Sequence, residues 1–316
     1  TRWNALQAVT NLLLPAQALN CKTHGAGMLR NFASIDSIRD KMMRHFEKNV
    51  PNCAVMLLID VLNSGNPLAA RAHAAAALGN LCSTEQYAHI LVTVGSGKAV
   101  RDVANILFAD AKTQQDKQFL VESKVSAITT LCLMVCNEEC CRIVLDTGAL
   151  VRLGPCLSSR EPSHLRIAAA KCLHNVTSFY TGSKAVADGT GLLEAILKTC
   201  KTDNQGLQEN LVACIANLSS FPNFIDHLMS GRSCATIVYL LKKGKGASKR
   251  LAAQVCKNVS RSQQAVYCKP FVEAHALRAL VNLLDHEKEV EDGCAEMAVL
   301  ALARFAASDT DITTKM

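Results

Sequence analysis

The sequence has few aromatic residues, prolines and glycines. Aromatic residues make up 4% of the 316 residues, and there are 7 prolines, 16 glycines and one tryptophan. This scarcity argues against a collagen-like or a disordered, low-complexity chain. The longest uncharged apolar run, residues 126–137, is too short to cross a bilayer, so no membrane span is predicted. The chain starts at Thr1, inside a repeat and without a recognisable signal peptide, which is consistent with a fragment.

Hydrophobic residues, in contrast, make up 49% of the chain, and most are Ala, Leu, Val, Ile and Cys. Small and unbranched apolar side chains suit closely packed helices. The 15 cysteines are an odd number, and most occupy apolar helical positions, such as 172, 214, 256 and 294. We interpret them as small buried hydrophobes of a protein in a reducing compartment, which predicts a cytoplasmic location.

One group of cysteines comes closest to a metal-ligand pattern. It consists of Cys132, Cys136, Cys140 and Cys141, and Cys132 and Cys136 are expected to share one helical face. A zinc site needs four convergent ligands, usually from paired CxxC-like motifs. No such pairs occur and no histidine is near in the sequence, so we predict neither a metal site nor a cofactor.

Three Asn-x-Ser/Thr triplets, at Asn175, Asn217 and Asn258, match the acceptor pattern for N-glycosylation. Their intervals of 42 and 41 residues are regular, and a regular interval is typical of repeated structural units rather than of glycan acceptors. Aligning the chain on asparagine adds Asn31 and Asn80 to the series. Leucine takes the equivalent place in two further segments, so the register positions are 31, 80, 133, 175, 217, 258 and 302.

Each sequence repeat contains a short, a medium and a long segment with periodic apolar residues. Their spacing is that of a helix rather than the alternation of a strand. Breakers separate the segments. Asn66 is predicted to be an N-cap followed by Pro67 at the first helical position, and Ser163 is predicted to cap another long helix. Two segments interrupt the period, at residues 42–52 and 110–124, and we interpret them as insertions.

Two segments carry a family resemblance. FVEAHALRALVNLL (271–284) and HAAAALGNLCSTEQ (73–86) resemble the armadillo-repeat consensus, and the resemblance covers roughly residues 20–307. It implies an all-α chain, a single right-handed armadillo-type α-solenoid over 1–316, with about seven partial or complete three-helix repeats. His275 stands where the consensus has glycine, which suggests a turn that tolerates the exchange.

The resemblance also implies a binding mode. In armadillo proteins the third helices line the concave face, where a ladder of asparagines hydrogen-bonds the main chain of an extended peptide. This role carries over to the five register asparagines but not to Leu133 and Leu302, so a continuous groove is expected over residues 163–260. The local alternative is that each amide links adjacent repeats by a hydrogen bond.

Charge indicates the kind of peptide. No tryptophan occurs one turn before a ladder asparagine, unlike in the nuclear import adaptors of this superfamily. Basic residues flank the ladder instead, the net charge is +7, and residues 241–250 form a basic loop. We therefore expect an extended acidic protein segment, although the loop alone could be an ordinary solvated surface. The predicted partner-binding residues are Asn80, Lys171, His174, Asn175, Asn217, Arg250, Gln254, Lys257 and Asn258.

These patterns leave three functional hypotheses. The first is a non-catalytic scaffold for protein–protein interaction. The second is a structural subunit of a cytoskeletal or ciliary assembly that uses the convex face and the insertions. The third is a regulatory or substrate-binding arm of a larger enzyme, such as a ubiquitin ligase. No catalytic arrangement of side chains stands out, so we predict no enzyme and no small-molecule substrate. Nucleic acid is not the expected partner because no aromatic residues interleave the basic ones.

Overall fold

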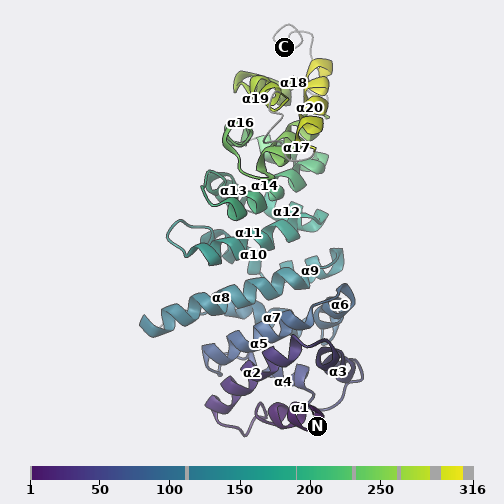
Figure 1. Ribbon diagram of the computed structural model, residues 1–316, viewed down its shortest axis with the longest axis vertical. Coiled ribbons are helices and arrows are strands. Elements are labelled where there is room, and N and C mark those ends of the chain that lie inside the picture. Colours follow the sequence, from purple (N-terminus) through teal and green to yellow (C-terminus); the bar gives the residue numbers. More distant parts are fainter. Residues whose placement is uncertain are drawn as a thin grey trace. The chain divides into compact units, whose positions relative to one another are not determined.

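The computed structural model describes residues 2–110, 114–189, 191–229, 233–261, 265–284 and 293–308. Within these ranges the regular structure is entirely helical, which confirms the all-α prediction (Figure 1). The chain divides into two compact units. Unit 1 consists of Thr1–Cys156 and Glu161–Cys172, and unit 2 of Leu157–Arg160 and Leu173–Met316.

Unit 1 is built from α-helices and one 3-10 helix, η1. In chain order they are α1 (Arg2–Asn11), α2 (Leu19–Ala33), α3 (Asp36–Glu47), α4 (Ala54–Val61), α5 (Leu68–Leu81), α6 (Glu85–Thr93), α7 (Lys98–Ala104), η1 (Asn105–Phe108), α8 (Gln114–Met134), α9 (Glu138–Asp146) and α10 (Ala149–Cys156). The next helix, α11 (Ser163–Thr177), carries the chain from unit 1 into unit 2.

Unit 2 continues in the same manner, with the 3-10 helix η2. Its elements are α12 (Tyr180–Asp188), α13 (Leu192–Thr199), α14 (Gln205–Ser220), η2 (Pro222–Phe224), α15 (Ile225–Met229), α16 (Ser233–Lys243), α17 (Ser248–Ser260), α18 (Ala265–Glu273), α19 (Ala276–Asn282) and α20 (Cys294–Ser308).

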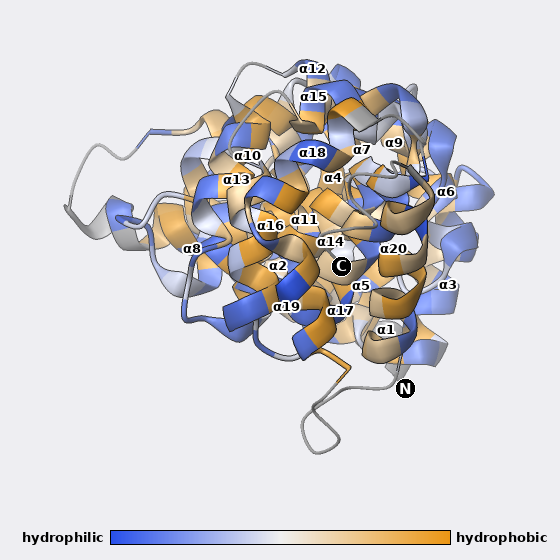
Figure 2. Cartoon of the chain, turned by 90° about the horizontal axis from the view of Figure 1, so that it is seen from above, coloured by the Kyte–Doolittle hydropathy of each residue, from blue (hydrophilic) through white to orange (hydrophobic). Residues whose placement is uncertain are grey.

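The long helices pack on one another within each unit. In unit 1, α5 lies between α2 and α8, and in unit 2, α17 lies between α14 and α20. Small and unbranched side chains fill the contacts, and Leu29, Leu78 and Val255 are fully buried. Ten of the 16 residues of α14 are buried, and hydrophobic segments alternate with hydrophilic ones along the helices in Figure 2. All seven register positions lie in long helices, namely α2, α5, α8, α11, α14, α17 and α20.

Two predicted helix starts are wrong. Helix α5 begins at Leu68, and its N-cap is Pro67, whose extended ψ of 143° places it outside the helix. Asn66 therefore lies too early to cap, and its side-chain Nδ2 donates to the carbonyl oxygen of Asp60 at 3.4 Å. Ser163 is the first residue of α11 rather than the cap before it. In α5 the residue predicted to be the first helical one, Pro67, has an extended ψ and becomes the cap instead.

The two predicted insertions become parts of helices and turns. Most of residues 110–124 is an N-terminal extension of α8, which has 21 residues, while residues 111–113 lie outside the described part. Residues 42–52 supply the end of α3 and a turn in which Asn49 and Asn52 have positive φ. The insertion at residues 110–124 therefore lengthens a long helix instead of adding a loop.

The turn at His275 has the conformation expected from the glycine of the consensus. His275 is the N-cap of α19 with φ 63° and ψ 35°, in the left-handed region. Gly97 and Gly191 occupy the same position before α7 and α13, also with left-handed backbones. Because a residue with a Cβ pays a steric penalty in this region, histidine keeps the turn at a cost in stability.

This geometry predicts that His275→Gly stabilises the protein. The exchange removes the left-handed penalty, about 1 kcal/mol, and the larger backbone freedom of glycine in the unfolded chain offsets part of the gain. Urea denaturation followed by circular dichroism measures the difference. The matched control is Gly191→His, which should destabilise unit 2, and a loss of stability in His275→Gly would contradict the argument.

Candidate functional site: the third-helix ladder

The ladder asparagines lie in the last turns of the long helices. At these helix ends the backbone hydrogen bonds tighten, so that the N–H of Ser34, Ser178 and Arg261 each bonds the carbonyl three residues earlier. The carbonyls of Arg30, His174 and Lys257, four residues earlier, are thereby left without that backbone donor. A carbonyl without a donor inside a packed interface is costly, so a side chain must supply one.

The amide of the next long helix supplies it. Asn80 Nδ2 donates to the carbonyl oxygen of Arg30 at 2.9 Å. Asn217 Nδ2 donates to the carbonyl oxygen of His174 at 3.3 Å. Each acceptor directly precedes the register asparagine of the neighbouring helix, so the ladder links successive long helices within each unit. Local linking of this kind is the alternative that the sequence left open.

Arginine does the same in the last long helix, where the register position is leucine. Arg304 Nη1 on α20 donates to the carbonyl oxygen of Lys257 at 2.9 Å. Helix α8, whose register position is also leucine, uses Thr130, whose Oγ1 donates to the carbonyl oxygen of Ala75 at 2.8 Å. The link to the carbonyl before the register position is therefore kept by arginine in α20, whereas the Thr130 hydroxyl of α8 lies within hydrogen-bond distance of a different carbonyl, one turn earlier in α5, and of the Ser126 carbonyl of its own helix.

The third residue of two triplets, Thr177 and Ser219, takes part in these links. Thr177 Oγ1 donates to the carbonyl oxygen of His174 and accepts from Asn217 Nδ2, at 3.0 and 3.3 Å. Ser219 Oγ donates to the carbonyl oxygen of Ala216 and accepts from Asn258 Nδ2, at 2.7 and 3.0 Å. The hydroxyl thus caps its own helix and receives the amide of the next one. This double role explains why Asn-x-Ser/Thr recurs with the period of the repeat.

The nine predicted binding residues are divided between the units. Asn80 and Lys171 belong to unit 1, and the other seven belong to unit 2. Lys171 is exposed, while Arg250, Gln254 and Lys257 are half-buried at one-turn spacing on α17, which brings them to one helical face with Asn258. His174 Nδ1 lies 3.4 Å from the Oδ1 of Asn210, so this histidine is engaged with the next helix.

Three cations among the predicted binding residues, Lys171 in unit 1 and Arg250 and Lys257 in unit 2, have no counter-ion among the described residues. Among the described residues, no carboxylate lies within 4.0 Å of Lys171, Arg250 or Lys257. The basic loop is different. Lys245 Nζ lies 3.5 Å from a carboxylate oxygen of Asp203, and the backbone N–H of Lys245 donates to Gln208 Oε1 at 2.9 Å. The loop is therefore an anchored turn whose charge is partly neutralised.

A hollow adjoins the ladder in unit 2. It has a volume of about 330 Å³ and is lined by Ser219, Ser220, Pro222, Ile225, Asn258 and Arg261. Its polar groups come from the ends of α14 and α17, next to the link between Asn258 and Ser219. A side chain of a bound segment could enter beside the amide here without displacing the core.

The structure adds residues that the sequence pattern did not single out. Arg304 and Asn210 complete links between long helices, and His73 lies beside Arg30 on neighbouring helices. His73 precedes Asn80 by seven residues, two helical turns on the same face. That spacing was the available signal for His73, whereas the partners of Arg304 and Asn210 depend on how the helices stack.

The cysteine cluster differs from its prediction in two ways. Helix α8 ends at Met134, so Cys136 lies beyond it and faces Cys140, with 3.5 Å between the two sulfurs. A histidine is also close, because His89 Nδ1 lies 3.6 Å from Cys140 Sγ. Nonetheless, no group of three or more His, Cys, Asp or Glu residues suited to a metal ion occurs in the described part of the chain. All 15 cysteines are free thiols.

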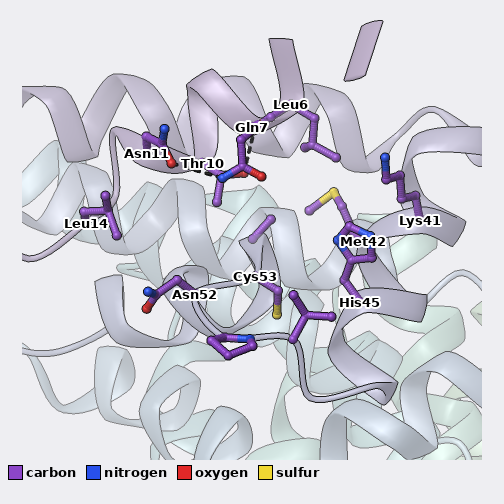
Figure 3. A pocket seen from close by; sticks show the side chains of 13 residues that line it. Leu6, Gln7, Thr10, Asn11, Leu14, Lys41, Met42, His45, Asn52 and Cys53 are labelled. Carbon is purple, nitrogen blue, oxygen red and sulfur yellow. Dashed lines mark hydrogen bonds between the residues drawn. The ribbon is translucent and has the colours of Figure 1, made fainter. Parts of the chain in front are cut away.

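A separate cavity of about 300 Å³ lies in unit 1 between α1, α3 and the turn before α4 (Figure 3). Lys41, His45 and Cys53 are among its lining residues. Burial lowers the pKa of His45, and Lys41 and other nearby cations lower it further, while burial raises the pKa of Cys53. Because the thiolate is the nucleophilic form of cysteine, a raised pKa makes Cys53 a poor nucleophile at neutral pH.

Comparisons with solved structures agree with this architecture. An engineered protein superposes with a TM-score of 0.68 at 21% identity, over 80% of this chain and 98% of its own. Computationally designed armadillo repeat proteins for modular peptide recognition give 0.67 at 19%, over 78% and 98%. A designed armadillo repeat protein in complex with the peptide (KR)4 gives 0.65 at 19%, over 78% and 98%.

The chain has the armadillo-repeat fold. The designed proteins share its helical architecture at identities that establish fold alone. No protein-family model and no curated protein matches the sequence. No described helix is long and apolar enough to span a membrane.

The link between Asn217 and Thr177 should be measurable as a coupling energy. Asn217→Ala and Thr177→Val are each expected to lower the free energy of unfolding by about 1 kcal/mol, because each leaves a helix-end carbonyl or a buried amide without its partner. The double variant should lose less than the sum of the single losses. Asn282→Ala, an exposed position at the end of α19, is the control. Strict additivity would mean that the two side chains do not interact.

Burial predicts slow alkylation of the cysteines in the folded protein. It raises the pKa of Cys214 to about 12 and of Cys132 to about 11, so little thiolate is present at neutral pH. Iodoacetamide labelling followed by peptide mass spectrometry should show these thiols reacting only as the chain unfolds. The half-buried Cys21 provides an internal comparison. Rapid labelling of Cys214 without unfolding would contradict the packing described for α14.

Proposed function

We propose that this chain is a non-catalytic scaffold that binds an extended, acidic segment of a partner protein along the third-helix face. The observation that carries the proposal is the set of cations on this face that have no carboxylate partner among the described residues. Arg250 and Lys257 lie on α17 beside Asn258. An anionic side chain from a partner would supply the missing counter-charge.

The ladder amides support an extended rather than a helical ligand. A primary amide has two N–H donors and one acceptor oxygen, and the links described for Asn80 and Asn258 each use Nδ2 as a donor to a single acceptor. The acceptor oxygen and the second N–H are thus left to pair with a main-chain N–H and C=O. An extended segment presents both groups at regular intervals along its edge, which suits a series of evenly spaced amides.

The charge near the ladder favours a ligand whose charge is opposite to that of the peptide bound by one of the designed proteins. That protein was solved with (KR)4, a basic peptide. Here Lys171, Arg250 and Lys257 belong to the predicted face, and the whole chain carries a formal charge of +7. A basic peptide would be repelled, so the shared fold supports peptide recognition while the side chains set a different specificity.

The test compares three fluorescent peptides of equal length: an acidic Glu/Gly/Ser peptide, the same peptide with Gln for Glu, and (KR)4. Fluorescence polarisation should show the acidic peptide binding most tightly, with affinity that falls as salt rises. Arg250→Gln combined with Lys257→Gln should weaken acidic-peptide binding by a few-fold to about tenfold, because exposed ion pairs contribute roughly 0.2–1 kcal/mol each.

The matched control removes the same charge elsewhere. Lys98→Gln combined with Lys245→Gln changes two lysines that already pair with Asp60 and Asp203, at 3.0 and 3.5 Å. This variant should bind the acidic peptide almost as well as the unmodified chain. Equal losses in both variants would show a net-charge effect without a site, and preference for (KR)4 would overturn the proposed specificity.

A further inference from the structure

A second group of basic residue types lies in unit 1, outside the predicted binding residues. Arg30 on α2 and His73 on α5 meet across the two helices, with Arg30 Nη1 3.5 Å from His73 Nδ1. His24 lies on α2, six residues before Arg30. Arg30 and His73 are half-buried, while His24 is exposed. Asn80, the ladder residue of α5, donates to the backbone carbonyl of Arg30 and so lies next to the group.

This group has no negative partner among the described residues. No carboxylate lies within 4.0 Å of Arg30, His73 or His24, whereas other cations of the chain do have one. Arg39 contacts Asp36 at 2.6 Å, and His227 contacts Asp188 at 3.5 Å. The local field is therefore positive, and its effect is visible on the histidine. Burial lowers the pKa of His73, and the charges of Arg30 and His24 lower it further.

Hydrogen-bond chemistry orients His73 toward a ligand. An arginine side chain can only donate, so in its contact with Arg30 the Nδ1 of a neutral His73 is the acceptor. The proton then resides on Nε2. A Cβ added to Gly27 would lie 3.7 Å from this Nε2 and 3.5 Å from Cδ2, so the imidazole lies over a position without a side chain. Gly27 has no side chain that would cover the Nε2–H donor, so a ligand can approach this donor from the side of Gly27.

We propose that Arg30, His73 and His24 form a site for an oxyanion, a carboxylate or a phosphate, carried by a side chain of the bound protein segment. The planar guanidinium and the Nε2–H supply donors from two adjacent helices, which is a suitable arrangement for a planar or tetrahedral oxyanion. The inference rests on the proposed function for its ligand, a protein segment. The affinity of the three side chains for a small anion does not depend on that function.

The first experiment titrates the full chain with small probes and follows the histidine C2–H signals by NMR. The probes are N-acetyl-glutamate amide, O-phospho-N-acetylserine amide and N-acetyl-glutamine amide. An anion bound at the site favours the imidazolium form, so the pKa of His73 should rise with the first two probes and stay unchanged with the third. A rise of about one unit corresponds to about tenfold tighter binding of the anion to the protonated form.

Comparison of the carboxylate and phosphate arms identifies the source of the anion, and Arg30→Gln should abolish the response to both. The control variant is Arg39→Gln, because Arg39 already contacts Asp36. The His227 signal serves as an internal standard, since its ring is paired with Asp188. If His73 shifts equally with all three probes, or equally in both arginine variants, no oxyanion site exists there.

A second experiment places the anion on the protein itself. Gly27→Glu puts a carboxylate on α2 three residues from both His24 and Arg30 and beside His73, whereas Gly27→Gln adds the same bulk without charge. The pKa of His73 should rise in the Glu variant relative to the Gln variant, and the response to the phosphoserine probe should be lost in the Glu variant. An unchanged His73 in both variants would overturn the proposal even if the probe experiment failed through weak binding.

The two proposals fail separately. If the small anions bind at Arg30 and His73 but the acidic peptide does not bind the chain, the oxyanion site stands and the proposed function is wrong. If the acidic peptide binds through Arg250 and Lys257 while Arg30→Gln changes neither the peptide nor the probe affinity, the proposed function stands and the inference about unit 1 is wrong.

Discussion

The hydrogen bonds at the ends of the long helices determine most of what this sequence shows. The last turns tighten, and the carbonyls of Arg30, His174 and Lys257 are left inside helix–helix contacts without their regular backbone donor. Because a buried acceptor without a donor is costly, side chains supply donors to these carbonyls. The hydroxyls of Thr177 and Ser260 donate to His174 and Lys257 within the same helix, and in all three cases the following helix donates as well. Asparagine does so in α5 and α14, and arginine does so in α20. The register of the repeat and the recurrence of asparagine follow from this requirement.

The same amides are used in the proposed binding face, so stability and binding are coupled there. Removing Asn217 would unlink α14 from α11 as well as remove a donor for a ligand. A loss of binding after that change would therefore not identify a contact. The cations Arg250 and Lys257 are free of this ambiguity, because no described carboxylate is paired with them in the protein itself. For this reason, substitutions of the cations beside the ladder test the proposed function more clearly than substitutions of its asparagines.

Short-range features were predictable from the sequence, and contacts between helices were not. The long helices followed from apolar periodicity, and the left-handed turn at His275 followed from one consensus position. The start of α5 was misplaced by one residue because asparagine favours the N-cap and proline the first helical position, whereas Pro67 itself is the cap. The pairs His73 with Arg30 and His89 with Cys140 are 43 and 51 residues apart, so their meeting depends on how successive helices stack. Periodicity fixes which face a residue occupies and leaves its cross-helix neighbour undetermined.

The unbalanced charges have a thermodynamic consequence. Burial and the charges of Arg30 and His24 hold the pKa of His73 below its ordinary value, so protonating this imidazole in the folded protein costs free energy. An acid placed nearby would offset that cost. In the proposed site a bound anion would supply that acid, so its affinity would include part of this cost. Under the proposed function, the cations of both units that have no described carboxylate partner would favour an acidic ligand for the same electrostatic reason.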